Sequence, residues 1–344
     1  MEIGAPVPIQ VPLSVASYRS AVEEFLCHMG LRLENGLEYY AVLHDERGAI
    51  IGGGGFEGNT IKCIAADPNA RGMGLTNILV SHLRSEMSAR GVQNIFVFTK
   101  PSNLEIFESL AFSLVGSAPK AILMESSRRG AKSLERTLSA HKKEGITGAI
   151  VMNCNPFTLG HLYLIEKAAG MCDNLIIFPV KADRSVFPYD DRLMLIKEGT
   201  AHLKNVDILD GGEYIISQAT FPTYFLKEMS EASVTYAMLD VDIFARHIVP
   251  PLGISIRFAG SEPLDPLTNE YNRAMKTVLE PMGVEVKVIE RFELGGKPVS
   301  ASRVRALIKE GLIEQTKELL PETTYSYLLS PRGQAAAARL RERI

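Results

Sequence analysis

The stretch NPFTLGH, residues 155–161, follows an apolar run that ends at Met152 and precedes LYLIEKAA, a segment with the pattern of a helix. The expected start of that helix shows no Ser or Asp cap. Instead, Gly160 lets the backbone approach another group closely, and His161 stands beside the positive end of the helix dipole. This arrangement suits a phosphate, because the first backbone N–H groups of a helix have no partner within the helix.

Apolar strands alternate with helices from about residue 146 onward. We expect strands at 147–152, 175–180, 206–209, 234–238, 255–259 and 284–289. The expected helices span 161–171, 190–202, 221–229, 241–248, 268–281 and 303–310. This alternation predicts βαβ units and a Rossmann-like parallel α/β sheet covered on both faces. Such sheets bind ligands at the carboxyl ends of their strands, which is where NPFTLGH lies.

The first third of the chain has a different order of elements, which indicates a mixed α/β domain. The expected elements are a helix at 17–29, strands at 39–44, 49–55 and 60–66, a helix at 75–90, a strand at 94–99 and a short helix that ends near Phe112.

A basic segment separates the two patterns. Residues 126–144 hold six Lys or Arg against two acidic residues. We interpret this segment as an exposed helix or linker, and a solvated surface is favoured over a dock for an acidic partner. The predicted domains are therefore 1–126, a linker or helix at 127–145, and 146–344.

Composition narrows the class of protein. The 344 residues are 46% apolar and 22% charged, which allows a sizeable core in each of two domains. The net charge of −3 gives no basic surface of the kind that nucleic acids need, and no apolar run approaches the roughly 20 residues of a membrane span. The four cysteines form no CxxC pair, and the first residues lack the pattern of a signal peptide. We expect a cytoplasmic enzyme that binds neither nucleic acid nor membranes.

A second phosphate-handling pattern, VSASRVR, occupies residues 299–305. Residues 158–161 resemble the T/H-x-G-H signature of the nucleotidyltransferase superfamily, and residues 299–305 resemble its I/V-S-S/A-x-x-x-R signature. Either pattern alone is weak, whereas both in this order are strong. The resemblance implies a reaction in which a nucleophile attacks the α-phosphorus of ATP and pyrophosphate leaves.

Such a reaction needs groups that position the reactants and neutralise developing charge. His161 can donate a hydrogen bond to an α-phosphate oxygen, and the Thr158 hydroxyl can donate another. Ser300 and Ser302, at the start of the helix expected from 303, can bind the β- and γ-phosphates. Lys181 is a further catalytic candidate, and the remaining candidates for binding ATP are Asn155, Pro156, Phe157, Gly160, Arg192, Gly260, Glu262, Arg303 and Arg305.

For some of these residues the sequence also allows a role other than binding a ligand. Lys181 can be a surface lysine, and Arg192 can be salt-bridged to an adjacent aspartate. The loop that starts at Gly260 can contact adenosine or can simply turn. Asp240 and Asp242 are either Mg²⁺ ligands or helix caps. The expected cofactors are ATP and Mg²⁺, with the metal held mainly by the ATP phosphates.

Four stretches together resemble one family within that superfamily, the citrate lyase ligases. They are NCNPFTLGHLYLIEKAA (153–169), DRSVFPYDDRLMLI (183–196), FAGSEPLDPLTNEYNRAM (258–275) and VSASRVRALI (299–308). The resemblance covers nearly all of 146–330. It implies that the protein activates acetate with ATP, through acetyl-adenylate. The acetyl group then passes to the thiol of the CoA-derived prosthetic group on the acyl-carrier subunit of citrate lyase.

The front of the chain resembles a second family. CIAADPNARGMGLTNILVSHL, residues 63–83, is similar to motif A of the GNAT acetyltransferases. The resemblance implies that Arg71, Gly72 and Gly74 present backbone N–H groups to the pyrophosphate of a CoA. Phe107 stands where an active transferase often has a tyrosine acid, and a phenyl ring cannot protonate a leaving thiolate. Binding of a CoA-like group and a purely structural role both remain open.

Two other functions compete with the ligase. A small-molecule adenylyltransferase of the phosphopantetheine adenylyltransferase type shares the T-x-G-H pattern. A GNAT acetyltransferase or CoA sensor would use the front domain instead. The front domain and the stretch at 260–272 favour the ligase over the first alternative, while Phe107 and the intact T-x-G-H pattern argue against the second.

Overall fold

The computed structural model describes residues 6–70, 72–127, 129–181, 185–215, 230–261 and 266–342. The chain forms two compact units, of which the first comprises Met1–Ser133 and Phe221–Leu239 and the second Leu134–Thr220 and Asp240–Ile344. The predicted boundaries of the domains stay a prediction.

The first unit is built on a seven-stranded mixed sheet with the order β1-β2-β3-β4-β5-β7-β6. Its neighbouring strands run antiparallel, except for the parallel pair β4 and β5. The strands are β1 Ile9–Gln10, β2 Tyr39–His44, β3 Ile50–Glu57, β4 Thr60–Ala66, β5 Phe96–Thr99, β6 Ser113–Ser117 and β7 Ile122–Glu125. The helices are α1 Ala16–His28, α2 Leu75–Ala89 and α3 Leu104–Ser109, with short 3₁₀ turns at Pro68–Ala70 and Pro101–Asn103.

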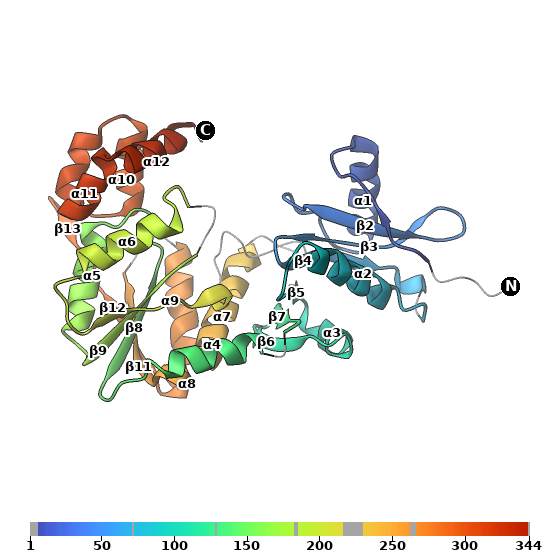
Figure 1. Ribbon diagram of the computed structural model, residues 1–344. Coiled ribbons are helices and arrows are strands. Elements are labelled where there is room, and N and C mark those ends of the chain that lie inside the picture. The colour runs from blue at the N-terminus through green and yellow to red at the C-terminus, as the bar shows by residue number, and fades with distance from the viewer. Residues whose placement is uncertain are drawn as a thin grey trace. The chain divides into compact units, whose positions relative to one another are not determined.

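Helices α2 and α3 cover one face of this sheet, and α1 lies on the other (Figure 1). The apolar side of α2 repeats at Leu75, Leu79 and Leu83, the spacing that places residues on one face of a helix. A run of glycines at 52–55 in β3 lets this face approach the strand closely, and a Cβ at Gly52 would lie 3.2 Å from the Leu79 side chain. The elements expected in this third of the chain are confirmed to within a few residues.

The second unit is built on a five-stranded parallel sheet with the order β10-β9-β8-β11-β12. Its strands are β8 Thr147–Met152, β9 Asn174–Pro179, β10 Val206–Ile208, β11 Ile254–Gly260 and β12 Glu285–Ile289. Its helices are α5 Leu159–Ala169, α6 Tyr189–Gly199, α8 Val249–Leu252, α9 Pro266–Leu279, α10 Ala301–Lys309, α11 Glu322–Leu329 and α12 Pro331–Glu342, while α4 Gly130–Ser139 and α7 Ser230–His247 have residues in both units. A hairpin of β13 Glu293–Leu294 and β14 Lys297–Pro298 precedes α10, and 3₁₀ turns occupy Gly212–Tyr214, Glu280–Met282 and Ile313–Leu319. The expected fold class is confirmed by these two sheets.

The order of the parallel strands determines where a ligand can bind. The chain starts in the centre at β8, moves outward through β9 to β10, and returns across the sheet to β11 and β12. The strand order therefore reverses between β8 and β11, and such a switch point leaves a crevice at the carboxyl ends of the strands. The loop from β8 to α5 carries NPFTLGH to this point.

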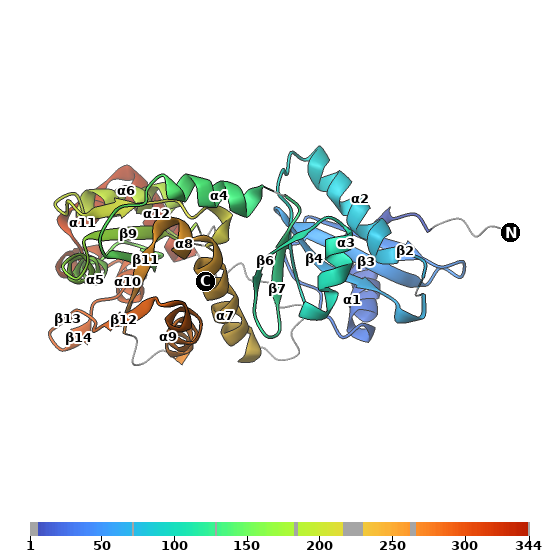
Figure 2. The ribbon, with the colours of Figure 1, turned by 90° about the horizontal axis from the view of Figure 1, so that it is seen from below.

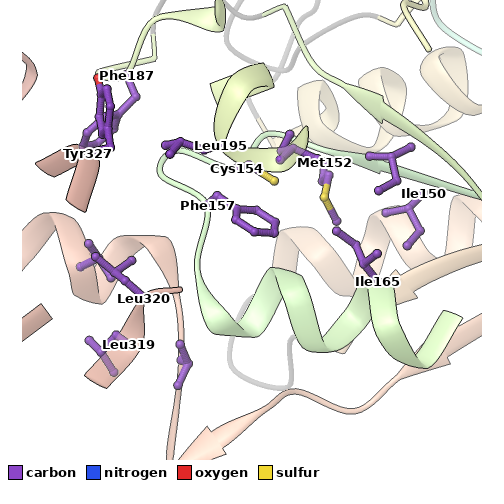
Figure 3. Packing of buried hydrophobic residues seen from close by; sticks show 14 of the residues in the cluster. Ile150, Met152, Cys154, Phe157, Ile165, Phe187, Leu195, Leu319, Leu320 and Tyr327 are labelled. Carbon is purple, nitrogen blue, oxygen red and sulfur yellow. The ribbon is translucent and has the colours of Figure 1, made fainter. Parts of the chain in front are cut away.

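A large hydrophobic cluster of the second unit covers one face of the parallel sheet. Side chains of β8, β9 and β11 pack there against α5, α6 and the C-terminal helices α10, α11 and α12. Figure 2 shows these elements from below. Figure 3 shows part of this cluster, in which Phe157 of the β8–α5 loop lies among Cys154, Leu195 and Ile165. The loop thus rests on the core.

One expected strand is wrong. Residues 234–238 lie inside α7, a single helix of 18 residues that also includes all but the last residue of the helix expected at 241–248. Its buried residues Ala232, Thr235 and Leu239 follow a helical spacing, while Val234 is 43% exposed. A short apolar run with β-branched residues cannot be assigned to strand or helix by periodicity alone. The helix expected at 221–229 lies outside the described residues.

The basic segment contains the expected exposed helix, α4, with Lys132 and Arg136 at the surface. Ala131 and Leu138 of this helix are buried, so one side of the helix packs against other parts of the protein. In the part of the chain that the structure describes, no helix combines the length and the apolar character that crossing a membrane requires.

Candidate active site

The start of α5 has a side-chain cap, contrary to expectation, and the helix begins at Leu159, two residues earlier than expected. Thr158 is the N-cap residue, and its hydroxyl oxygen accepts a hydrogen bond from the backbone N–H of His161 at 3.4 Å. In return, Nδ1 of His161 accepts from the backbone N–H of Thr158 at 3.0 Å. This reciprocal arrangement is a capping box in which histidine takes the place usual for Glu or Gln. Thr158 was missed as a cap because the helix was expected to start later.

The capping box determines the tautomer of His161. Because Nδ1 accepts a backbone hydrogen bond, the neutral ring carries its proton on Nε2. Burial, together with the guanidinium groups of Arg291 and Arg305, lowers the pKa of His161 from 6.5 to about 4. The imidazole also stacks on Phe157, with ring centroids 6.0 Å apart. His161 is thus a neutral, firmly held hydrogen-bond donor at pH 7.

The structure brings the two phosphate motifs together. A Cβ built on Gly160 would lie closer than 3.0 Å to the carbonyl oxygen of Val299, so only glycine permits this approach of α5 to the segment before α10. Ser300 caps α10, and its hydroxyl accepts a hydrogen bond from the N–H of Arg303 at 3.2 Å. The N-termini of two helices therefore meet at one place, where both present partial positive charge.

A pocket of about 470 Å³ opens at this meeting point. Its lining comes from the starts of α5 and α10, the end of β11, and the segment that follows β12. The expected site residues that it brings together are Thr158, Gly160, His161, Gly260, Ser300 and Ser302. The lining also includes Tyr163, Arg291 and Phe292, which sequence reasoning missed. The position of Arg291 and Phe292 just after a parallel strand could have indicated that they line the site.

Arg305 connects the two motifs. One nitrogen of its guanidinium donates to the carbonyl oxygen of Asn155 at 2.5 Å, and another donates to Ser302 Oγ at 3.1 Å. Burial lowers the pKa of Arg305. The Asn155 side chain accepts from the N–H of Phe187 at 3.1 Å, which holds the loop from its other side. Pro156 and Phe157 are buried, and the ring of Phe157 stacks on His161. Any contact of Phe157 with ATP would therefore come from its backbone.

Arg192 and Lys181 are not among the residues that line this pocket. Arg192 is fully buried, and its guanidinium donates to the carbonyl oxygens of Asn153 at 2.6 Å and Val180 at 2.9 Å. It therefore joins the carboxyl ends of β8 and β9. Lys181 Nζ lies 2.6 Å from Asp210 Oδ2, a hydrogen bond that raises the pKa of the lysine. Contact of either residue with ATP stays a prediction, as it does for Arg303.

The aspartate beside Arg192 has different partners from those expected. Asp191 accepts a hydrogen bond from the Tyr327 hydroxyl at 2.7 Å, and its other oxygen lies 2.6 Å from Arg332. These contacts attach α6 to α11 and α12. Glu262 and Arg71, which were also expected to bind ligands, lie outside the described residues.

The two aspartates proposed as metal ligands lie within α7. Asp240 accepts from the Tyr271 hydroxyl at 2.5 Å, and Asp242 forms a salt bridge with Arg246 at 2.7 Å. In the described ranges, no group of three His, Cys, Asp or Glu side chains is placed to hold a metal ion. Binding of Mg²⁺ through the ATP phosphates stays a prediction.

A second pocket, of about 670 Å³, lies in the first unit. Strands β4 and β5 pair through Thr60↔Phe96 and Ile61↔Val97, and the pocket lies where the two strands continue beyond this pairing. Its lining includes Gly72, Gly74, Thr76, Lys100, Asn103 and Phe107. Gly74 is the N-cap of α2 and has a φ of +62°, a conformation that favours glycine. The start of a 15-residue helix thus faces a pocket beside the motif that resembles the GNAT family.

Comparison with known proteins identifies the family. A family model described as the citrate lyase ligase C-terminal domain matches residues 147–328. The citrate (pro-3S)-lyase ligase of Klebsiella pneumoniae is 41% identical over 317 residues, which cover 90% of this chain and 92% of the relative. The phosphopantetheine adenylyltransferase of Photorhabdus laumondii is 28% identical over 105 residues, covering 28% of this chain and 64% of that protein.

A solved structure of a putative acyl-CoA N-acyltransferase from Klebsiella pneumoniae is also similar. It covers 35% of this chain and 95% of its own length, with 14% identity and a TM-score of 0.29. The family model spans more than half of the chain, and the ligase relative matches almost end to end. The chain belongs to the citrate lyase ligase family.

Proposed function

We propose that the second unit forms acetyl-adenylate from acetate and ATP, and that the acetyl group then passes to the thiol of the CoA-derived prosthetic group on the acyl-carrier subunit of citrate lyase. Membership of the family makes the chain an acid–thiol ligase that activates citrate lyase. In the first step a carboxylate oxygen bonds to the α-phosphorus and pyrophosphate leaves. In the second, the thiol loses its proton and attacks the acetyl carbon, and AMP leaves. We propose that both steps occur in the cytoplasm.

The observation that carries this proposal is the meeting of two helix N-termini around a neutral histidine. In this proposal the ATP phosphates lie over the starts of α5 and α10, where Ser300 and Ser302 offer hydroxyls and backbone N–H groups. Gly260, at the end of β11, leaves room for the adenosine. Mg²⁺ would be held mainly by the ATP phosphates, where it would neutralise part of their charge.

His161 donates from Nε2 to an oxygen of the α-phosphate. Its lowered pKa favours the neutral ring, whose proton lies on Nε2 because Nδ1 accepts the backbone hydrogen bond. The bond strengthens as the charge on that oxygen grows, which is the condition for stabilising a transition state. The reaction needs no general base in the first step, because a carboxylate is already ionised at pH 7.

The test of this role is the variant His161→Ala in acetate-dependent exchange of pyrophosphate into ATP. We expect kcat to fall by roughly 10²–10³, the scale for one preorganised donor, with little change in the KM for ATP. His202→Ala is the matched control, since His202 pairs with Glu166 on an exposed surface. Near-normal turnover of His161→Ala would leave the residue as a helix cap alone.

The same assay separates the ligase from an adenylyltransferase. The ligase exchanges pyrophosphate when acetate is added, whereas an adenylyltransferase of the phosphopantetheine type responds to phosphopantetheine. The sequence similarity favours the ligase, because the ligase relative covers 90% of this chain and the adenylyltransferase covers 28%.

We propose further that the pocket of the first unit holds the prosthetic group of the carrier. The carrier's group is derived from CoA and presents a pyrophosphate, and the start of α2 at Gly74 lines the pocket. Gly74→Glu places a negative charge there and should leave acetate-dependent exchange intact while it lowers transfer to the carrier thiol. Gly91→Glu is the control, because Gly91 also has a positive φ of +83° and open space, but follows the other end of α2. If both variants transfer the acetyl group normally, the first unit is structural.

A further inference from the structure

The segment after β12 brings an arginine to the pocket that holds His161. Arg291 lies two residues beyond the carboxyl end of this strand and lines the pocket. Its backbone N–H donates to Ser261 Oγ at 3.2 Å, and the N–H of Ser261 donates to the carbonyl oxygen of Ile289 at 2.8 Å. The ends of β11 and β12 are therefore tied together beneath Arg291, which fixes the place from which its side chain starts.

The far side of the same segment is held as well. The N–H of Val299 donates to the carbonyl oxygen of Phe292 at 2.9 Å, which closes the hairpin of β13 and β14. The chain thus returns at once from Arg291 to the start of α10. Arg291 and Ser300 consequently face one pocket although eight residues separate them in sequence.

Few charged side chains are found among the described residues that line this pocket. Of the described residues that line it, Arg291 is the one Lys or Arg, and Glu290 is the one acid. Burial lowers the pKa of Arg291, and its guanidinium helps to lower the pKa of His161. The positive field of Arg291 therefore reaches the donor that we place against the α-phosphate.

Adenylation of an acid brings two anions into contact, and each needs its own positive partner. The starts of α5 and α10 serve the phosphates, since helix N-termini bind phosphate through backbone N–H groups. A carboxylate is best matched by a guanidinium, whose planar fork donates two parallel hydrogen bonds. Strand β12 lies two strands away from β8, a distance of about 10 Å across the sheet. Arg291 thus starts on the side of the pocket away from the loop that carries His161.

We propose that Arg291 binds the carboxylate of the acid substrate and holds it against the α-phosphate. This inference rests on the proposed function, because it assumes that the pocket adenylates an acid. During the step, a carboxylate oxygen forms its bond to the α-phosphorus while the bond from that phosphorus to the pyrophosphate oxygen breaks. Arg291 remains protonated throughout and supplies orientation and charge.

The test compares Arg291→Gln with the wild type in acetate-dependent exchange of pyrophosphate into ATP, with acetate and ATP varied separately. We expect the KM for acetate to rise by about 10- to 100-fold, the effect of losing hydrogen bonds to a charged group, and the KM for ATP to change by less than about twofold. Arg291→Lys keeps the charge without the fork, so its KM for acetate should lie between the two. Arg273→Gln, which removes an exposed arginine on α9, should behave like the wild type.

Several results would overturn the inference. A rise in the KM for ATP with an unchanged KM for acetate assigns Arg291 to the nucleotide, and unchanged values for both remove it from the site. Thermal unfolding of each variant shows whether it is folded. If Arg291→Gln does not fold, the KM for acetate of Arg291→Lys decides whether the inference holds. A wild type without acetate-dependent exchange would refute the proposed function itself, which is a different outcome from a change in the variants.

Discussion

Gly160→Ala tests whether the two phosphate motifs must be in contact for the site to work. The added methyl group would lie closer than 3.0 Å to the carbonyl oxygen of Val299, a separation that real Cβ atoms essentially never show. Because the atom it meets belongs to the backbone, no side chain can turn away to relieve the clash. The start of α5 and the segment before α10 would have to move apart by roughly 0.5–1 Å in a closely packed region.

This displacement should affect activity far more than stability. Overpacking costs about 1–3 kcal/mol, whereas alanine in place of glycine within a helix recovers up to about 1 kcal/mol. We therefore expect a net loss of about 0–2 kcal/mol in the free energy of unfolding. A shift of about 1 Å in the position of His161 relative to the serines of α10 should lower kcat by around 10²-fold.

The assay is acetate-dependent pyrophosphate exchange for kcat, with urea unfolding of the same preparations for stability. Gly170→Ala is the matched control at the other end of α5, where the backbone has a φ of −74° and the nearest atom to the new Cβ, the Glu166 carbonyl oxygen, is 3.6 Å away. It should keep its activity and gain up to about 1 kcal/mol. The reasoning fails if Gly160→Ala also keeps a kcat within about twofold of the wild type.

Three further predictions concern buried groups. The pKa of His161 is lowered to about 4, so stability that is full above pH 6.5 is lost as the pH falls toward 4. Between pH 7 and pH 4.5 the wild type should lose roughly 1–2.5 kcal/mol more than His161→Gln in urea unfolding, and equal losses would contradict a neutral histidine. Arg192→Gln leaves the backbone carbonyls after β8 and β9 without their donor and should cost about 2–4 kcal/mol, so an unchanged urea midpoint would refute the bracing role. Tyr327→Phe removes a hydrogen bond to the buried carboxylate of Asp191 and should cost about 1.5–3 kcal/mol; a cost below about 0.5 kcal/mol would show that Arg332 alone suffices.

The sequence alone predicts the fold class, which the two sheets confirm, and part of the candidate site. The alternation of strands and helices after residue 146 predicts a parallel sheet because each period reflects local backbone geometry. The same local logic identifies His161 and Ser300, since the start of a helix binds phosphate wherever that helix lies. It failed at 234–238, where a run too short to show its period could form either a strand or a helix.

Which charged residues face the pocket depends on the tertiary fold. Arg192 and Arg291 each follow or precede an apolar element, and nothing local tells them apart. The fold buries Arg192 under the ends of β8 and β9, whereas Arg291 reaches the pocket because β12 pairs with β11 and the hairpin after it returns to α10. The contact of Gly160 with Val299 has the same origin, since it joins residues 139 positions apart (299 minus 160). Periodicity indicates which face of its own helix or strand a residue occupies. The place where distant segments meet depends instead on strand order and helix packing.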